Sequence, residues 1–225
     1  METIGREHLL VLKQELECYE FYQKQISECD IAIESCYNEF DKQNSDEETK
    51  NKIANNKKLT GKNAPGFNLR QLLCGISGVD LTIIPGLGVL TIQTIISEVG
   101  LNMNKWHTEK HFTSWLGLSP NNKITGGKVF STKTKRVINK ASTAFRIAAL
   151  AVGKGRSAVA GFYRRIKSKA GVQKAITATA RKLACMFYRL LKYGTEYVEQ
   201  GIEAYEKKYN ATSRRLCYRR SIFCS

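Results

Sequence analysis

"VQKAITATARKLACMFYRLLK", residues 172–192, is the stretch that decides the fold class. Its apolar side chains recur every three or four residues, which is the period of an α-helix with one buried face. That face is predicted to contain Val172, Ile176, Ala180, Leu183, Phe187 and Leu191. The other face is expected to turn its cations toward solvent or a phosphate backbone: Lys174, Arg181, Lys182, Arg189 and Lys192.

A second helix is predicted from about residue 135 to about residue 152. Its inward positions are Val137, Ala141, Ala144, Phe145, Ala148 and Val152. Lys133, Arg136 and Lys140 would stack on another face of this helix, where they are candidate DNA contacts. Because no alternating apolar run is long enough to establish a sheet, the predicted fold class is mostly α.

Residues 1–42 are predicted to form one long amphipathic helix. Large side chains follow steps of three and four through Leu9, Leu12, Leu16, Tyr19, Tyr22, Ile26, Cys29, Ile33, Cys36 and Phe40. This heptad-like seam with charged flanks favours a coiled coil, either between chains or within one chain, over a helix packed on its own domain. A homo-oligomer joined through this helix is the expected assembly. Residues 43–68 are polar and contain Pro65, which is typical of a linker or of the loop of a helical hairpin.

Charge is divided unevenly along the chain. Residues 1–50 hold five basic and thirteen acidic side chains, a net charge of −8, whereas residues 51–225 carry +24. Between Glu109 and Glu196 there is no Asp or Glu at all. A solvated face normally mixes both signs, so this run indicates a polyanionic partner, and nucleic acid is favoured over an anionic membrane surface.

The chain is expected to be cytoplasmic, with no membrane partner. The longest uncharged stretch, residues 81–97, is broken by Pro85, Gly86 and Gly88 and is not expected to span a bilayer. The first residues are acidic and amphipathic, which is unlike a signal peptide.

Neither cysteine nor histidine spacing indicates a metal site. The seven cysteines form no Cys-x-x-Cys pair and are interpreted as reduced thiols. His107 and His111 lie four residues apart, but no acid or cysteine completes a ligand set with them, and surface or packing roles are favoured. No metal or other cofactor is therefore expected in this chain.

"LTIIPGLGVLTIQTIISEVG", residues 81–100, places a Pro-Gly-Leu-Gly turn between two apolar runs. This pattern is typical of a helix-hairpin-helix element, in which glycines such as Gly86 and Gly88 let backbone N–H groups approach a DNA phosphate. A plain tight turn between two core helices is the alternative.

"NKITGGKVFS", residues 122–131, places the hydroxyl of Thr125 directly before Gly126 and Gly127. A hydroxyl nucleophile that attacks a phosphate needs an activating base or metal and stabilisation of the developing charge. Lys123 and Lys128 are positioned to supply positive charge, and the two glycine N–H groups to form a small anion nest. These residues alone leave three interpretations of Thr125 open: a nucleophile, a residue at the position of a lost nucleophile, or a turn residue.

Tyrosines alternate with cations further along the chain. Tyr163 precedes Arg164 and Arg165, and Tyr188 precedes Arg189, an arrangement that suits base stacking and phosphate contact. We favour core or rim packing for the tyrosine rings and phosphate contact for Arg164 and Arg165.

Four separated motifs resemble one known family. They are "HLLVLKQELECYEFYQKQISECDIAIE", "IPGLGVLTIQTIISEVG", "WHTEKHFTSWLGLSPNNKITGGKV" and "KAITATARKLACMFYRLLKYGTEYVEQG". In this order they resemble the coiled-coil and C-terminal halves of the IS-one-ten/IS-one-sixteen family of insertion-sequence transposases, which includes the Piv DNA invertases. The likeness runs from about residue 6 to about residue 209.

The resemblance implies a DNA transposase or site-specific recombinase with two catalytic parts. Family members carry a RuvC-like domain whose four carboxylates hold divalent metal, so Mg²⁺ is expected only with that domain. Their transposase domain, expected here at residues 69–209, attacks DNA through the serine of a Ser-Gly-Gly turn. Bridge RNA is the implied second nucleic-acid partner, and the coiled coil joins protomers.

Two departures from the family bear on activity. Thr125 occupies the position of the nucleophilic serine, and too few residues precede Glu7 for a RuvC-like domain, which needs roughly one hundred or more. Residues 210–225 diverge into a basic tail. We therefore weigh a transposase portion that is inactive alone against an inactive, self-associating nucleic-acid-binding remnant. A helix-hairpin-helix repair or architectural protein is the more distant alternative.

Overall fold

The computed structural model describes residues 5–44, 64–131 and 133–194, which fall into two compact units. The first unit spans Met1–Ile76 and the second spans Ser77–Ser225. Most of the predicted linker, the end of the predicted transposase domain and the predicted basic tail (residues 45–63, 195–209 and 210–225) lie outside the described residues.

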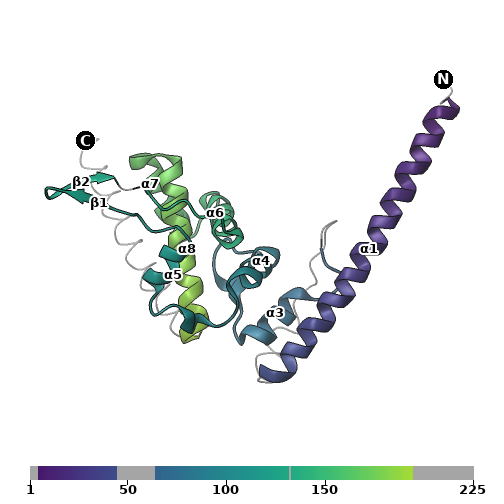
Figure 1. The fold of residues 1–225 in the computed structure, drawn as a ribbon, viewed down its shortest axis with the longest axis horizontal. Coiled ribbons are helices and arrows are strands. Elements are labelled where there is room, and N and C mark those ends of the chain that lie inside the picture. The colour runs from purple at the N-terminus through teal and green to yellow at the C-terminus, as the bar shows by residue number, and fades with distance from the viewer. Residues whose placement is uncertain (1–4, 45–63, 132, 195–225) are drawn as a thin grey trace, which may run out of the picture. The chain divides into compact units, whose positions relative to one another are not determined.

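The described residues are mostly helical, which confirms the predicted fold class (Figure 1). Short 3-10 helices, η1 (Leu81–Ile83) and η2 (Met103–Lys105), lie between the longer helices. The only strands in the described part form one small hairpin, β1 (Lys123–Thr125) and β2 (Lys128–Ser131).

The first unit contains α1 (Arg6–Asn44), one continuous helix of 39 residues, and nearly all of α3 (Leu69–Ser77). The long helix predicted from the seam is confirmed. Its seam lies in solvent, with Leu16 56% and Tyr19 61% exposed, so its pairing with a second helix stays a prediction. The backbone N–H of Gly66 donates to Oδ2 of Asp30 at 2.8 Å, so the chain returns to α1 before α3 begins.

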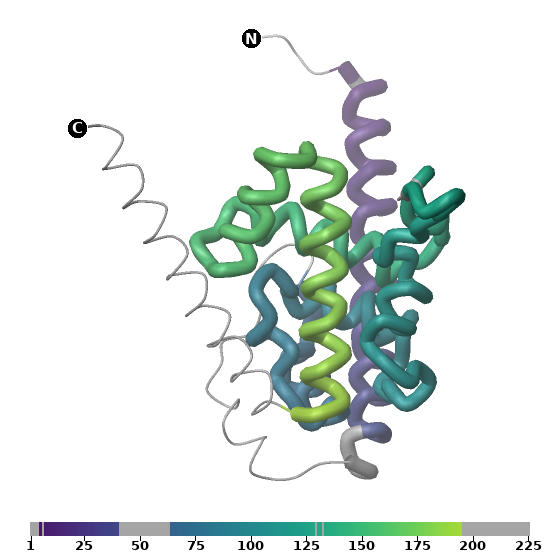
Figure 2. Tube along the Cα trace, turned by 90° about the vertical axis from the view of Figure 1, so that its left-hand side faces the viewer, coloured from purple at the N-terminus to yellow at the C-terminus, as the bar shows by residue number. Residues whose placement is uncertain are grey.

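Helix α8 (Val172–Tyr193) is the central element of the second unit. It packs against α5 (Glu109–Trp115), α6 (Lys140–Gly153) and α7 (Ala158–Ala170), and Figure 2 shows it, green to yellow, with helices on both sides. Ala180, Leu183 and Phe187 are fully buried, as the period predicts. Val172 is 43% exposed, contrary to the prediction, because it is the first residue of the helix.

Aromatic rings form the centre of this core. The ring of Phe112 lies 6.4 Å from that of Phe187 and 5.8 Å from that of Tyr188, and Phe145 meets Phe187 edge-on at 5.7 Å. The hydroxyl of Tyr188 donates to the carbonyl oxygen of Trp106 at 2.9 Å. The core therefore joins α5, α6 and α8 and satisfies the buried phenol, as a buried tyrosine requires.

Helix α6 begins at Lys140, later than predicted, because Asn139 caps it. The Asn139 side chain accepts a hydrogen bond from the Ser142 N–H at 3.2 Å, which satisfies one of the open donors of the first turn. The predicted helical face containing Lys133 and Arg136 is therefore wrong, since both residues precede the helix in non-helical backbone. Val137, predicted to be buried on that helix, is 40% exposed.

Helix α7 was not predicted as a helix. Ser157 caps it by accepting from the Ala160 N–H, and Tyr163 anchors it with only 7% of its surface exposed. The expected core packing of Tyr163 is thereby confirmed. Small residues such as Gly161 weaken the apolar period here, so the helix depends on packing more than on local pattern.

The two apolar runs on either side of the Pro-Gly-Leu-Gly turn differ in structure; the second forms α4 (Val89–Val99). The second apolar run is helical, but the first forms only the single turn η1. Gly86 has φ +85°, and a Cβ there would lie 2.1 Å from Cγ2 of Val152. Gly86 therefore serves the close approach of this turn to α6, which favours the tight-turn interpretation.

Candidate nucleic-acid interface

A basic cleft of about 1210 Å³ opens in the second unit. Its walls come from α6, α7, α8 and the segment of residues 133–137. No Asp or Glu lines it, whereas eight cations do: Lys133, Lys135, Arg136, Arg146, Lys174, Arg181, Lys182 and Arg189. Such one-sided charge in a concave site raises the local concentration of an anionic ligand.

One face of α8 forms the longest wall. Its lining positions repeat with helical spacing from Gln173 to Arg189, in the pairs 173/174, 177/178, 181/182 and 185/186. At about 1.5 Å of rise per residue, this wall is about 24 Å long. The cationic face predicted for α8 is thus concave surface, except at Lys192, which does not line the cleft.

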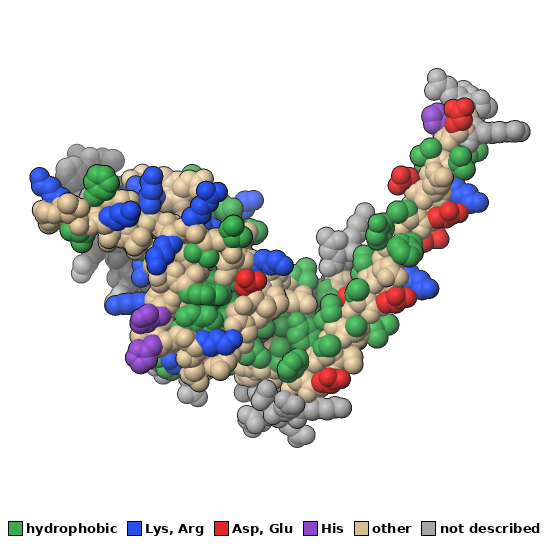
Figure 3. All heavy atoms as spheres, in the orientation of Figure 1, with side chains coloured by type: hydrophobic (Ala, Val, Ile, Leu, Met, Phe, Trp, Pro, Cys, Tyr) green, Lys and Arg blue, Asp and Glu red, His purple; other side chains and the backbone are tan. Residues whose placement is uncertain are grey.

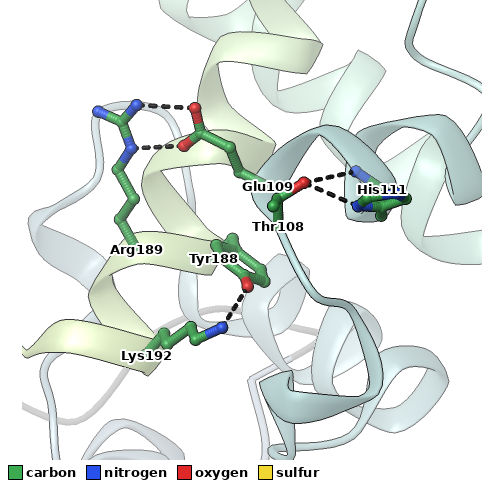
Figure 4. Close-up of polar contacts among 6 residues, drawn as sticks. All are labelled: Thr108, Glu109, His111, Tyr188, Arg189 and Lys192. Carbon is green, nitrogen blue, oxygen red and sulfur yellow. Dashed lines mark hydrogen bonds and ion pairs between the residues drawn. The ribbon is translucent and has the colours of Figure 1, made fainter.

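Lys192 instead forms a hydrogen bond with Tyr188, a residue of the core. Its Nζ donates to the Tyr188 hydroxyl at 2.8 Å, the contact drawn in Figure 4. This hydrogen bond raises the pKa of Lys192 above its ordinary value.

Phe162 of α7 faces Lys182 of α8 within the cleft wall. The Lys182 Nζ lies 4.9 Å from the centre of the Phe162 ring, and the Arg165 guanidinium lies 5.7 Å from it. Burial, followed by the repulsion of Arg165 and Arg189, lowers the pKa of Lys182 to about 8. The lining also contains apolar side chains: Leu118, Val159, Ala178 and Met186.

Glu109 holds Arg189 at the end of the α8 wall. The guanidinium donates from Nε and Nη2 to the two carboxylate oxygens, the Nη2 contact at 2.8 Å (Figure 4). Since Glu109 lies in the first turn of α5, the bidentate pair also joins α5 to α8. Burial, and then the Glu109 charge, raises the pKa of the Cys185 thiol in the same wall.

The hairpin that carries Thr125 begins at the rim of this cleft. Pro120 and Thr134, both lining residues, form a β-bridge at its base, and the Asn121 N–H donates to the Lys133 carbonyl. From there β1 runs to Thr125, which pairs with Lys128 across the turn. At about 3.4 Å per residue, the hairpin carries Thr125 at most about 17 Å from that bridge.

The predicted nucleophile position lies at the hairpin tip. Thr125, Gly126 and Gly127 are all exposed, and both glycines have positive φ, +57° and +76°. Within the described residues the Thr125 hydroxyl has no hydrogen-bond partner. Lys123 and Lys128 flank it, also exposed, so the geometry offers positive charge near an accessible hydroxyl.

Two predicted DNA contacts from the sequence enter the cleft: Lys133 and Arg136. The others do not line it. Lys140 opens α6, Gly88 caps α4 without a side-chain hydrogen bond, and Arg164 donates to the Gly155 carbonyl oxygen at 2.7 Å. Arg165 is exposed beside Phe162. The cleft gathers some of the predicted contacts and leaves the rest on neighbouring surface.

Three cleft residues were missed from the sequence: Lys135, Arg146 and Phe162. Arg146 lies in α6, and which face of that helix it occupies could be assigned only once the start of the helix at Lys140 was known. Phe162 lies in α7, which the sequence did not predict. The acid-free run that contains all three was the available signal.

The described residues do not fit the divalent metal of the resembled family. No group of three or more His, Cys, Asp or Glu side chains comes together among them. Asp80 accepts from the Thr82 N–H and hydroxyl, and Glu109 is engaged by Arg189. His111 bonds the Thr108 hydroxyl through Nδ1 at 2.8 Å, a local contact at the start of α5 (Figure 4).

Basic side chains outnumber acidic ones on the face of the second unit that Figure 3 shows. In the same view, acidic side chains gather along α1. None of the described helices combines the length and the apolar character that a bilayer crossing needs.

Comparison with known proteins gives a match to the model of a protein family. Residues 80–164 match the model of the Transposase IS116/IS110/IS902 family, a range that includes the Gly86 turn, the Thr125 hairpin, α6 and the first half of α7. The search of curated proteins and the search of solved structures found no match. The family match supports a transposase function for this chain.

Proposed function

We propose that this chain is the DNA-binding portion of a transposase similar to the IS116/IS110/IS902 family, and that it holds nucleic acid in the basic cleft. The observation that carries the proposal is the convergence of eight cations, from residues 133–137, α6 and α8, on one concavity whose lining has no acid. Cations placed in this way bind phosphates and release condensed counterions, which is the main source of affinity for nucleic acids.

The Thr125 hairpin is proposed to present its hydroxyl to a DNA phosphate next to the cleft. Its position between Lys123 and Lys128 supports this role, because both lysines favour a phosphate at the tip. The activating metal would come from a RuvC-like domain, whose four carboxylates hold Mg²⁺ in the resembled family. What this chain contributes is the hydroxyl, its positive surroundings and the DNA bound in the cleft.

A second candidate function is an inactive module that binds nucleic acid and self-associates. The observations that favour it are the β-methyl group of Thr125, which restricts χ1 and crowds an in-line attack, and the lack of a hydrogen-bond partner for its hydroxyl among the described residues. Either function uses the same cleft, and bridge RNA is a proposed ligand beside DNA in both.

Binding through the cleft is tested by fluorescence anisotropy with labelled DNA over a series of salt concentrations. We expect the double variant Arg146→Ala with Arg181→Ala to lose at least tenfold in affinity and to lower the salt slope by about two. The matched control, Lys167→Ala with Lys169→Ala, removes two exposed cations of α7 outside the cleft lining. Equal losses in the two double variants would show that the cleft is not the binding site.

Catalysis is tested by adding a RuvC-like domain from a member of the resembled family, with Mg²⁺, to the wild type, to Thr125→Ser and to Thr125→Ala. Strand cleavage by Thr125→Ser, with loss in Thr125→Ala, supports the transposase portion. Silence of all three proteins, while DNA binding is retained, supports the inactive module.

A further inference from the structure

We propose that the cleft takes an unpaired nucleic-acid strand in preference to a closed duplex, with one base seated on the ring of Phe162. This inference rests on the proposed function, since it names the form of nucleic acid that the same cleft accepts. It is carried by the juxtaposition of Phe162, Lys182 and the apolar part of the lining.

The lining offers two kinds of surface to one ligand. The cations suit phosphates, but Leu118, Val159, Phe162 and Met186 would gain nothing from a phosphodiester backbone. A closed duplex turns its phosphates outward and hides the faces of its bases within the stack. An unpaired strand exposes phosphates and base faces together, which is why single-strand sites combine cations with aromatic side chains.

The dimensions of the cleft suit several linked nucleotides. Its volume of about 1210 Å³ exceeds the roughly 300–1,000 Å³ of pockets that hold one drug-sized ligand. Cations recur along the α8 wall at Lys174, Arg181 and Lys182, so a strand lying along it meets positive charge at one end and in the middle, and reaches the Glu109-paired Arg189 at the other end. A single free nucleotide would leave most of this wall unused.

The ring of Phe162 is expected to exchange its contact with Lys182 for a contact with a base when the strand binds. In the free chain the Lys182 ammonium lies over its ring at 4.9 Å. A phosphate is a stronger partner for an ammonium than the weak negative charge of a ring face. The bound strand therefore draws Lys182 and the exposed Arg165, whose guanidinium lies 5.7 Å from the same ring, toward its phosphates, and the ring receives the base.

The experiment compares two ligands on the full chain: a labelled single-stranded 12-mer of thymidine and a hairpin duplex of equal charge. We expect the single strand to bind at least tenfold more tightly at the same salt concentration. Phe162→Leu, which keeps an apolar side chain but removes the ring, should weaken the single strand about tenfold and the duplex less than twofold. Phe162→Trp should restore single-strand binding.

A second measurement does not depend on the folding of a variant. A single strand containing 5-iodouracil, irradiated on the wild-type chain, should crosslink to the tryptic peptide of residues 157–164, which contains Phe162. Crosslinks confined to other peptides would overturn the proposal. So would an oligo-aspartate peptide that competes as well as a single strand of equal charge, because the cleft would then recognise charge alone.

The outcomes separate this inference from the proposed function. If neither nucleic acid binds with a salt-dependent affinity, the proposed function fails. If both bind equally, and the Arg146→Ala and Arg181→Ala changes weaken both, nucleic-acid binding stands and the preference for an unpaired strand is refuted.

Discussion

At the scale of single residues, Lys182 couples the cleft to pH. Its pKa of about 8 means that it is charged below pH 8 and loses its proton as the pH rises through that value, while arginines keep their charge. Nucleic acid binds the protonated form, so we expect affinity to fall between pH 7 and pH 9 and Lys182→Arg to abolish most of the fall. A pH profile of anisotropy, measured at constant ionic strength, checks this; a profile unchanged in Lys182→Arg would contradict it.

The same residue lowers stability in the free chain. The folded pKa lies below the unfolded value of 10.5, so the cost of the buried charge is fully present below pH 8 and disappears as the pH rises toward 10.5. We expect Lys182→Met to raise the midpoint of thermal unfolding at pH 7 and to have a smaller effect at pH 10. An equal rise of the midpoint at both pH values would mean that the added stability comes from better packing of the methionine and not from removal of the buried charge.

Glu109 is the residue that restrains Arg189. Glu109→Gln keeps the size of the side chain but removes the charge of a half-buried bidentate pair, and we expect it to cost about 1–2 kcal/mol of unfolding free energy. The change also removes the carboxylate that neutralises Arg189, so the net charge beside the cleft becomes more positive and DNA affinity should rise. Urea unfolding and anisotropy measure the two effects, with Glu98→Gln, an exposed acid on α4, as control. Weaker DNA binding in Glu109→Gln would mean that the pair positions Arg189 for its ligand.

At the scale of elements, the two glycines of the turn between η1 and α4 allow a packing role to be tested separately from phosphate contact. Gly86→Ala places a Cβ against Val152 and Ala148 at a positive φ, so we expect a loss of more than 2 kcal/mol in urea unfolding. Gly88→Ala is the matched control, because its Cβ would meet nothing nearer than the Thr91 Oγ1 at 3.9 Å. A DNA-binding loss in a stable Gly88→Ala variant would identify the α4 N-terminus as a phosphate contact.

How far the sequence predicts these elements depends on how strong their period is. Helix α8 was predicted with nearly its observed bounds, because its apolar period is unbroken from Ala180 to Leu191. Helix α6 was predicted to begin too early, because the apolar period was extended back to Val137, past Asn139, whose side chain caps the helix. Helix α7 was missed because Gly161 and small residues dilute its pattern.

The candidate site was harder to predict than the helices. Charge composition correctly indicated a basic surface, but the cleft combines residues 133–137 with parts of three helices, and a single sequence does not show which faces meet. Arg146 and Phe162 line the cleft only because α6 and α7 both pack on α8. The Thr125 turn was visible in the sequence as Thr-Gly-Gly, and its placement at a hairpin tip follows from the positive φ of both glycines.

At the scale of the whole molecule, α1 leaves its apolar seam in solvent. Exposed side chains such as Leu12 and Leu16, each more than half exposed, are expected to pair with the seam of another copy. Leu12→Glu with Leu16→Glu should lower the mass measured by light scattering to that of a single chain of 25.4 kDa. Gln14→Glu, a position outside the seam, is the control; a wild type that already has the mass of one chain would refute a coiled coil between copies.

The bridge between Pro120 and Thr134 makes the Thr125 hairpin a lever whose fulcrum lies in the wall of the cleft. With an arm of at most about 17 Å, a tilt of about 10° at the fulcrum would sweep the hydroxyl through about 3 Å, far more than the roughly 1 Å misplacement that costs an enzyme a hundredfold in rate. Because Thr134 forms this bridge and residues 133–137 line the cleft, a ligand held there would contact the base of the hairpin, where a small tilt is amplified at Thr125.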